Sequence, residues 1–128
     1  MKTETARKAA HWWAQFLESP VMPDNGDRSE LGFMTSGLAS ILQDKERSKL
    51  PPDAAQKFED ALFDLLIDRD GWNCFGVDYG PDYILQQAAT RAGFALGMTV
   101  LPWKTTMWIE GDKVTVRAGY QAETEEVK

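Results

Sequence analysis

The sequence predicts one α+β domain in which about four helices precede a small C-terminal antiparallel β-sheet. Apolar residues recur at helical spacing over the first two thirds of the chain, and the period then changes to alternation. Two alternating runs are separated by Gly111-Asp112, a two-residue loop typical of a tight hairpin. Helices followed by strands are typical of a domain whose helices pack on one face of the sheet.

Residues 3–18 place Trp13 and several alanines on one side of an amphipathic first helix. A loop over residues 19–27 then ends in Asp27, which forms a capping-box pattern with Glu30 and predicts the start of a second helix. This helix carries an apolar stripe (Leu31, Met34, Leu38, Ile41 and Leu42) beside a strip of small residues (Gly32, Ser36, Ala39 and Ser40). The small strip favours close approach of another element or of a second copy, so a homodimer is one expectation.

Pro51-Pro52-Asp53 predicts the start of a third helix that runs to about Asp70, with Gly71 as its terminator. Residues 72–77 are apolar and short, and they fit either a strand or a buried loop. Gly80-Pro81-Asp82 starts a fourth helix that closes at Gly93. The predicted strands cover residues 98–101, 105–110 and 113–118, and residues 123–128 are expected to form a flexible acidic tail.

The 128 residues, 43% hydrophobic and 27% charged, suit a single domain with its own core. One cysteine cannot form an internal disulfide, and the chain has neither a secretion signal nor an apolar run of about 18 residues. We therefore expect a cytoplasmic protein that does not contact membranes. The net charge of −6 argues against direct binding to nucleic acid, which depends on basic patches.

The residues that usually carry chemistry are sparse. The chain has one histidine (His11), one cysteine (Cys74) and ten scattered glycines, which supply no zinc cluster, nucleophile–base pair or phosphate loop. We therefore assign no catalytic residue, no metal and no cofactor. The best enzyme alternative is a small hydrolase or transferase that uses Asp78, Asp82 and Lys104 where the fourth helix meets the sheet.

Asp60, Asp64 and Asp68 form a row on the solvent side of the third helix, spaced by four positions and about 6 Å apart. This spacing resembles that of phosphates on a nucleic-acid strand, so the row fits a basic groove on a partner. The alternative is a solvated helix face that keeps the protein in solution.

Five tryptophans are a high number for this length, and three aromatic residues are candidate anchors for a partner: Trp103, Trp108 and Tyr120. Alternation places Trp108 on the sheet face opposite to Met107 and Ile109. Trp108 is exposed if the helices cover only one face, and covered if the sheet is packed on both sides.

The last fifty or so residues carry a set of short segments: Asp78-Tyr79-Gly80-Pro81-Asp82, Ala88-Ala89, Ala92-Gly93, residues 102–109 and Gly119-Tyr120. This part of the chain resembles small accessory proteins of phages and mobile elements, among them anti-CRISPR and other anti-defence inhibitors. The resemblance implies a non-enzymatic inhibitor of a larger host or defence protein, and it implies no role for single residues. We expect an acidic protein that occludes a basic, nucleic-acid-binding surface of its target. The alternative binding function is a toxin-neutralising immunity protein.

Overall fold

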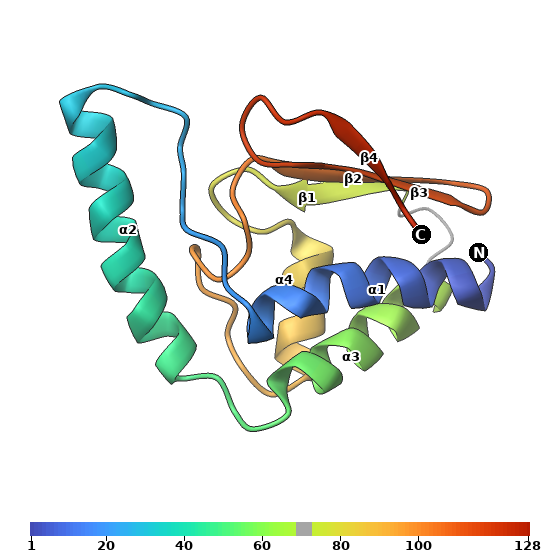
Figure 1. The fold of residues 1–128 in the computed structure, drawn as a ribbon. Helices are drawn as coiled ribbons and strands as arrows, with labels where there is room; N and C mark the ends of the chain where they lie inside the picture. The colour runs from blue at the N-terminus through green and yellow to red at the C-terminus, as the bar shows by residue number, and fades with distance from the viewer. Residues whose placement is uncertain (69–72) are drawn as a thin grey trace.

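A computed structural model describes residues 1–68 and 73–128. It confirms the α+β class, with a four-stranded antiparallel sheet accompanied by helices. The elements are α1 (Thr3–Glu18), α2 (Glu30–Ser48), α3 (Ala54–Asp68), β1 (Cys74–Val77), α4 (Tyr83–Arg91), β2 (Thr105–Glu110), β3 (Lys113–Ala118) and β4 (Thr124–Val127). In Figure 1, α1, α3 and α4 gather below the sheet, whereas α2 stands apart at one side of the molecule.

The sheet follows the order of the chain, β1-β2-β3-β4, with every neighbouring pair antiparallel. The predicted hairpin at Gly111-Asp112 is present, because Glu110 and Lys113 pair across it. Gly111 has a φ of 60°, which is the conformation that a two-residue turn with glycine in first place requires. Alternation along β2 buries Met107 and Ile109 and leaves Trp108 half-buried on the other face.

Three strand predictions need correction or completion. Residues 98–101 form turns instead of a strand, because the backbone of Thr99 bonds to α2. The expected acidic tail contains β4, which pairs with β3 and so becomes an edge strand. The segment 72–77, which fitted either a strand or a buried loop, contains β1. The expected end of the third helix, at Asp70 and Gly71, lies outside the described residues, and so does Trp72.

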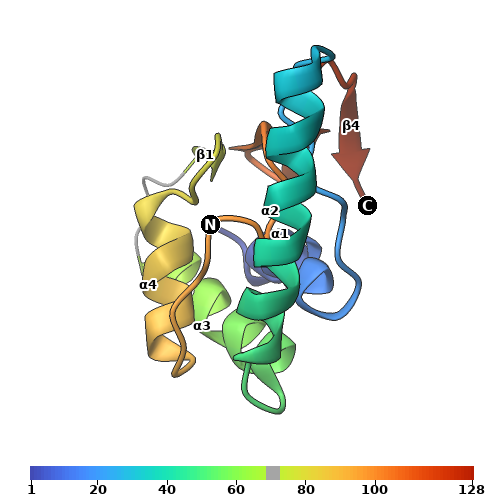
Figure 2. The ribbon, with the colours of Figure 1, turned by 90° about the vertical axis from the view of Figure 1, so that its left-hand side faces the viewer.

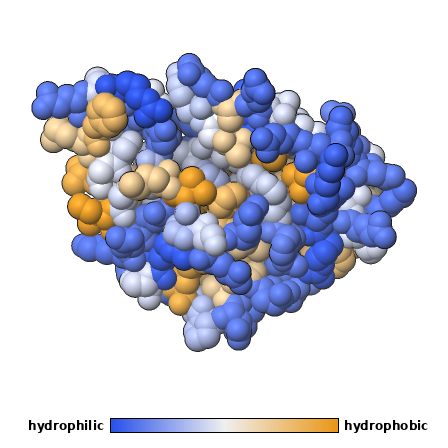
Figure 3. All heavy atoms as spheres, in the orientation of Figure 1, coloured by the Kyte–Doolittle hydropathy of each residue, from blue (hydrophilic) through white to orange (hydrophobic). Residues whose placement is uncertain are grey.

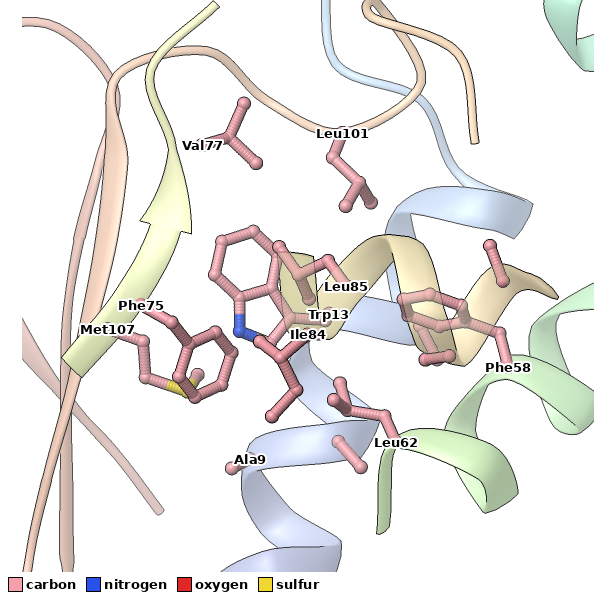
Figure 4. Packing of buried hydrophobic residues seen from close by; sticks show 14 of the residues in the cluster. Ala9, Trp13, Phe58, Leu62, Phe75, Val77, Ile84, Leu85, Leu101 and Met107 are labelled. Atoms are coloured by element: carbon pink, nitrogen blue, oxygen red, sulfur yellow. The ribbon is translucent and has the colours of Figure 1, made fainter. Parts of the chain in front are cut away.

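The core is built around α1. Trp13 is fully buried, and its ring lies between Phe75 of β1 and Leu85 of α4 (Figure 4). Ala6, Ala9 and Ala10 are also fully buried, because their small side chains let α1 approach α3 and the sheet closely. The adjacent Trp12 cannot point in the same direction, and it lies half-buried with its ring edge-on to Trp13 at 4.9 Å between centroids.

Local hydrogen bonds fix both ends of α4. Asp82 Oδ2 accepts the Gly76 N–H at 2.7 Å, which ties the start of α4 to β1. At the other end, Gly93 takes a φ of 94° and terminates α4 as predicted. The N–H groups of Gly93 and Phe94 donate back to the carbonyls of Thr90 and Ala89 at 3.1 and 3.0 Å, which is the Schellman arrangement.

Gly76 is where the β1–β2 pair leaves no room for a side chain. A Cβ at this position would lie 2.0 Å from the carbonyl oxygen of Thr105, whereas a Cβ at the nearby Gly80 would meet nothing within 4 Å. Gly76→Ala is therefore expected to lower the free energy of unfolding by about 1–3 kcal/mol, and Gly80→Ala is expected to change it by less than about 0.5 kcal/mol. Urea unfolding of both variants measures the difference, and equal stabilities would contradict the packing described for Gly76.

Candidate protein-binding surface

Helix α2 turns its apolar side away from the rest of the chain. We call this side the α2 apolar face; its residues, with their exposed fractions, are Leu31 (70%), Met34 (59%), Leu38 (66%), Ile41 (59%) and Leu42 (42%). Figure 3 shows hydrophobic side chains along the left edge of the molecule, where α2 lies in Figure 1. An amphipathic helix normally turns its apolar face to the core.

No helix in the described part of the chain is long and apolar enough to span a bilayer.

The inner side of α2 is held by polar side chains. We call Gln43, Glu46 and Arg47 the polar clamp. Gln43 is 6% exposed, and its Nε2 donates to the carbonyls of Val21 at 2.8 Å and Thr99 at 2.9 Å. Glu46 Oε2 accepts the N–H of Thr99 at 3.0 Å and its hydroxyl at 2.8 Å. Two of the three clamp residues therefore fasten α2 to the loop that precedes β2.

Arg47 fastens α2 to the end of α1. Its guanidinium donates to the carbonyls of Phe16 at 3.0 Å and Glu18 at 3.4 Å. These carbonyls belong to the last turn of α1, where the helix itself supplies no donors and a positive charge is favourable. Among the described residues, α2 does not pack on a helix or on the sheet in the way that α1 packs on α3. Its orientation therefore depends mainly on the polar clamp.

The start of α2 differs from the predicted capping box. Ser29 is the N-cap residue, and its hydroxyl accepts the Gly32 N–H at 3.2 Å. Asp27 instead accepts hydrogen bonds from the hydroxyl and the N–H of Ser29, which lower the pKa of its carboxyl. Gly26, just before it, lies against the Tyr120 ring. The charges of Asp27 and Glu30 therefore lie at the N-terminal end of α2, and the segment before the helix contacts the β3–β4 loop at Gly26.

The strip of small residues on α2 faces the chain's own 19–27 segment. Gly32 is buried against Asp27, and the Ser40 hydroxyl lies 2.8 Å from the sulfur of Met22. The expected close approach is thus made within the chain. The apolar stripe, and not the small strip, is the side of α2 that is open to a partner.

The acidic row lies on the exposed side of α3, as the spacing predicts. Asp60 Oδ1 accepts hydrogen bonds from Arg7 of α1 at 2.8 Å and from Gln56 at 3.0 Å. The charge of Asp60, one of the three in the row, is therefore balanced by Arg7 within the chain. Asp64 and Asp68 form no ion pair with the part of the chain that the structure describes. Asp64 and Asp68 are therefore the members of the row whose charges the described residues leave unbalanced.

The three aromatic candidates lie in different environments. Trp103 is only 7% exposed, and its indole N–H donates to the Met98 carbonyl at 2.8 Å, so it is a core residue. Tyr120 is half exposed in the β3–β4 loop. Trp108 lies on the sheet face away from the helices, with Thr115 opposite it. Since α3 is below the sheet in Figure 1, the acidic row and Trp108 lie on opposite sides of the molecule and form no common surface.

The residues of the enzyme alternative do come together. Lys104 forms an ion pair with Asp78, and its Nζ lies 4.4 Å from the centroid of the Tyr79 ring. A cavity of about 250 Å³ is lined by Lys104 and Asp78, and Asp82 and Cys74 line it as well. The hydrogen bond to Asp78 raises the pKa of Lys104, whereas a lysine that acts as a general base needs a lowered pKa. Asp82 already accepts the Gly76 N–H. These contacts fit a structural role.

Within the described residues, no group of three or more histidine, cysteine, aspartate or glutamate side chains is placed to hold a metal ion. The chain matches no protein-family model, and no curated protein is significantly similar to it.

The polar clamp can be tested on two neighbouring acids of α2. Glu46→Ala removes the acceptor of the nearly buried Thr99 N–H and hydroxyl, and is expected to lower the free energy of unfolding by about 1–3 kcal/mol. Amides of α2 should also exchange faster with solvent. Asp44→Ala, at an exposed site with no ion pair to the described part of the chain, is the control and should change the unfolding free energy by less than about 0.5 kcal/mol. If the two variants lose the same stability, the clamp does not hold α2.

Proposed function

We propose that this chain is a non-enzymatic binding protein that acts through protein–protein contact, and that the α2 apolar face is its docking surface. The observation that carries the proposal is the orientation of α2, whose polar side bonds inward while five large apolar side chains face water. Contiguous apolar patches of a few hundred Å² or more on a folded surface mark interaction sites. A cytoplasmic location is part of this proposal.

The energetics favour docking at this face. Full burial of a leucine, isoleucine or methionine side chain contributes about 1.5–3 kcal/mol, and Leu31, Leu38 and Ile41 each retain more than half of their surface for a partner. The polar clamp fixes α2 before the partner arrives, so little ordering cost remains at the moment of binding. Met34 adds an adaptable side chain that fits an irregular partner surface.

Photo-crosslinking in cells that express the chain tests this proposal. A photoreactive phenylalanine analogue in place of Leu38 should give one or more discrete adducts on irradiation, because the side chain lies in the middle of the α2 apolar face. The same analogue in place of Arg91, exposed at the end of α4, is the matched control and should give no discrete adduct. The absence of adducts from position 38, or the same adducts from both positions, would refute docking at α2.

A second candidate function is supported by the acidic row. Asp64 and Asp68 are exposed, lie one turn apart and are free of ion pairs with the described residues. Such a pair can steer the chain toward a basic groove and supply charge complementarity there. This is the surface that an inhibitor of a nucleic-acid-binding defence protein needs, and a toxin-neutralising immunity protein would use it in the same way.

Charge reversal separates this second candidate from a solvated helix face. Asp64→Lys/Asp68→Lys should reduce capture of a basic target protein several-fold, and added salt should reduce wild-type capture in the same way. Asp60 is left unchanged, because its reversal would break the contact with Arg7. Glu123→Lys/Glu125→Lys places the same charge change on an exposed segment elsewhere and serves as the control. Equal capture by both variants and no response to salt would leave the row without a binding role.

A further inference from the structure

We infer that the occupant of the α2 apolar face is a second copy of this chain, bound through α2 in antiparallel orientation. The inference rests on the proposed function, because it names the partner of the same surface. It draws on the spacing of the apolar residues, on the distribution of charge along α2 and on the surface area that two copies bury.

The spacing along α2 is that of a helix pair. Leu31, Met34, Leu38 and Ile41 follow one another at intervals of three, four and three residues, which is the pattern of a two-helix seam. Gln43, which is buried against the chain's own body, lies on the side of the helix away from this seam. The seam is therefore presented outward by the same contacts that hold α2 in place.

An antiparallel pair of α2 helices can bury the seam completely. With Leu31 opposite Ile41 of the second copy and Met34 opposite Leu38, the two-fold axis passes through the middle of the seam. Four consecutive layers are then apolar on both sides, and Leu42 flanks them. No polar residue lies within these four layers, and Lys45, which continues the same spacing after Ile41, lies opposite Asp27 of the second copy in this register.

The charges of α2 select the antiparallel orientation. Asp27 and Glu30 lie at its N-terminal end, while Lys45 and Lys49 lie at its C-terminal end. Antiparallel pairing brings each acidic end beside the basic end of the second copy and also opposes the helix dipoles favourably. Parallel pairing would instead place Lys45 next to Lys45 and Glu30 next to Glu30, and the like charges would repel each other at both ends of the pair. The basic end also holds two acids, Asp44 and Glu46, of which Glu46 is bonded inward to Thr99. Arg28 is the base at the acidic end.

The area is sufficient for a specific dimer. Side chains of this size at these exposures present on the order of 100 Å² each, so the five residues of two copies can bury up to about 1,000 Å² in total, which is the lower bound for a specific interface. Figure 2 views the molecule from the side of α2 and shows the helix in front of the other elements. A second copy can therefore approach α2 along its length. The exposed acids Asp64 and Asp68 lie on α3 and stay outside this interface.

Mass measurement of the purified chain tests the inference. Light scattering over a range of concentrations is expected to give twice the chain mass of 14.4 kDa. Leu38→Glu/Ile41→Glu should give the single-chain mass at the same concentrations, with unchanged circular dichroism, because both side chains are exposed. Phe33→Glu is the matched control, since Phe33 is 61% exposed on α2 but lies outside the seam, and it should stay dimeric. A wild type that remains a monomer at every concentration would overturn the inference, and so would a dimeric double variant.

Disulfide trapping tests the orientation. In a Cys74→Ser background, which removes the native exposed thiol, Leu31→Cys/Ile41→Cys should give an oxidised covalent dimer. Leu31→Cys alone should give none, because antiparallel pairing separates the two copies of position 31. A covalent dimer from the single variant would show parallel pairing and overturn the proposed orientation.

The two proposals fail in different ways. A foreign adduct from position 38 in cells, together with a monomeric purified chain, would overturn the second copy as occupant and support docking at α2. The absence of any adduct from position 38 would overturn docking itself.

Discussion

The polar clamp determines which side of α2 meets water, and the exposure of the α2 apolar face follows from it. Gln43, Glu46 and Arg47 together make six hydrogen bonds to backbone and side-chain groups of the loop before β2, the α1–α2 loop and the end of α1. Each contributes about 1 kcal/mol, or 1.5–3 kcal/mol where a charge is involved, which is comparable to burial of the α2 apolar face at about 1.5–3 kcal/mol per fully buried side chain. Rotation of α2 toward the core would bury the apolar face but break the hydrogen bonds of the polar clamp. A partner on the apolar face would bury the same side chains while these hydrogen bonds are kept.

The rest of the domain does not depend on the apolar face. Its core is formed by α1, α3, α4 and the inner face of the sheet around Trp13 and Phe58. The indole N–H of Trp13 has no hydrogen-bond partner among the described residues, a cost that burial of the large ring offsets. Because the face lies outside this core, substitutions such as Leu38→Glu are expected to leave the packed interior unchanged. The residues of the α2 apolar face are therefore separate from those that form the packed core.

Local signals in the sequence were sufficient for α1, for the end of α4 at Gly93 and for the hairpin at Gly111-Asp112, since each depends on residues close in the chain. They were insufficient for β4, whose acidic residues form a strand only because β3 offers an edge. The orientation of α2 is likewise set by distant contacts, because Glu46 and Thr99 are 53 positions apart. For the same reason the sequence placed Trp103 among the exposed anchors and left Arg7 out of the acidic row, although Arg7 pairs with Asp60 across the α1–α3 contact.

The separation of the two surfaces has a consequence for how they would work together. An apolar seam supplies affinity that changes little with salt, and the charges at its ends select the orientation of the pair. The exposed acids of α3 act at longer range and weaken as salt increases. A two-fold pair through α2 would present two such acidic rows on one particle, because Asp64 and Asp68 lie on α3 and outside the pairing helix. Two linked rows bind a target with two basic sites more tightly than either row alone, since the second contact is intramolecular. Self-association at α2 would thus strengthen the electrostatic contact at α3 without any direct contact between the two surfaces.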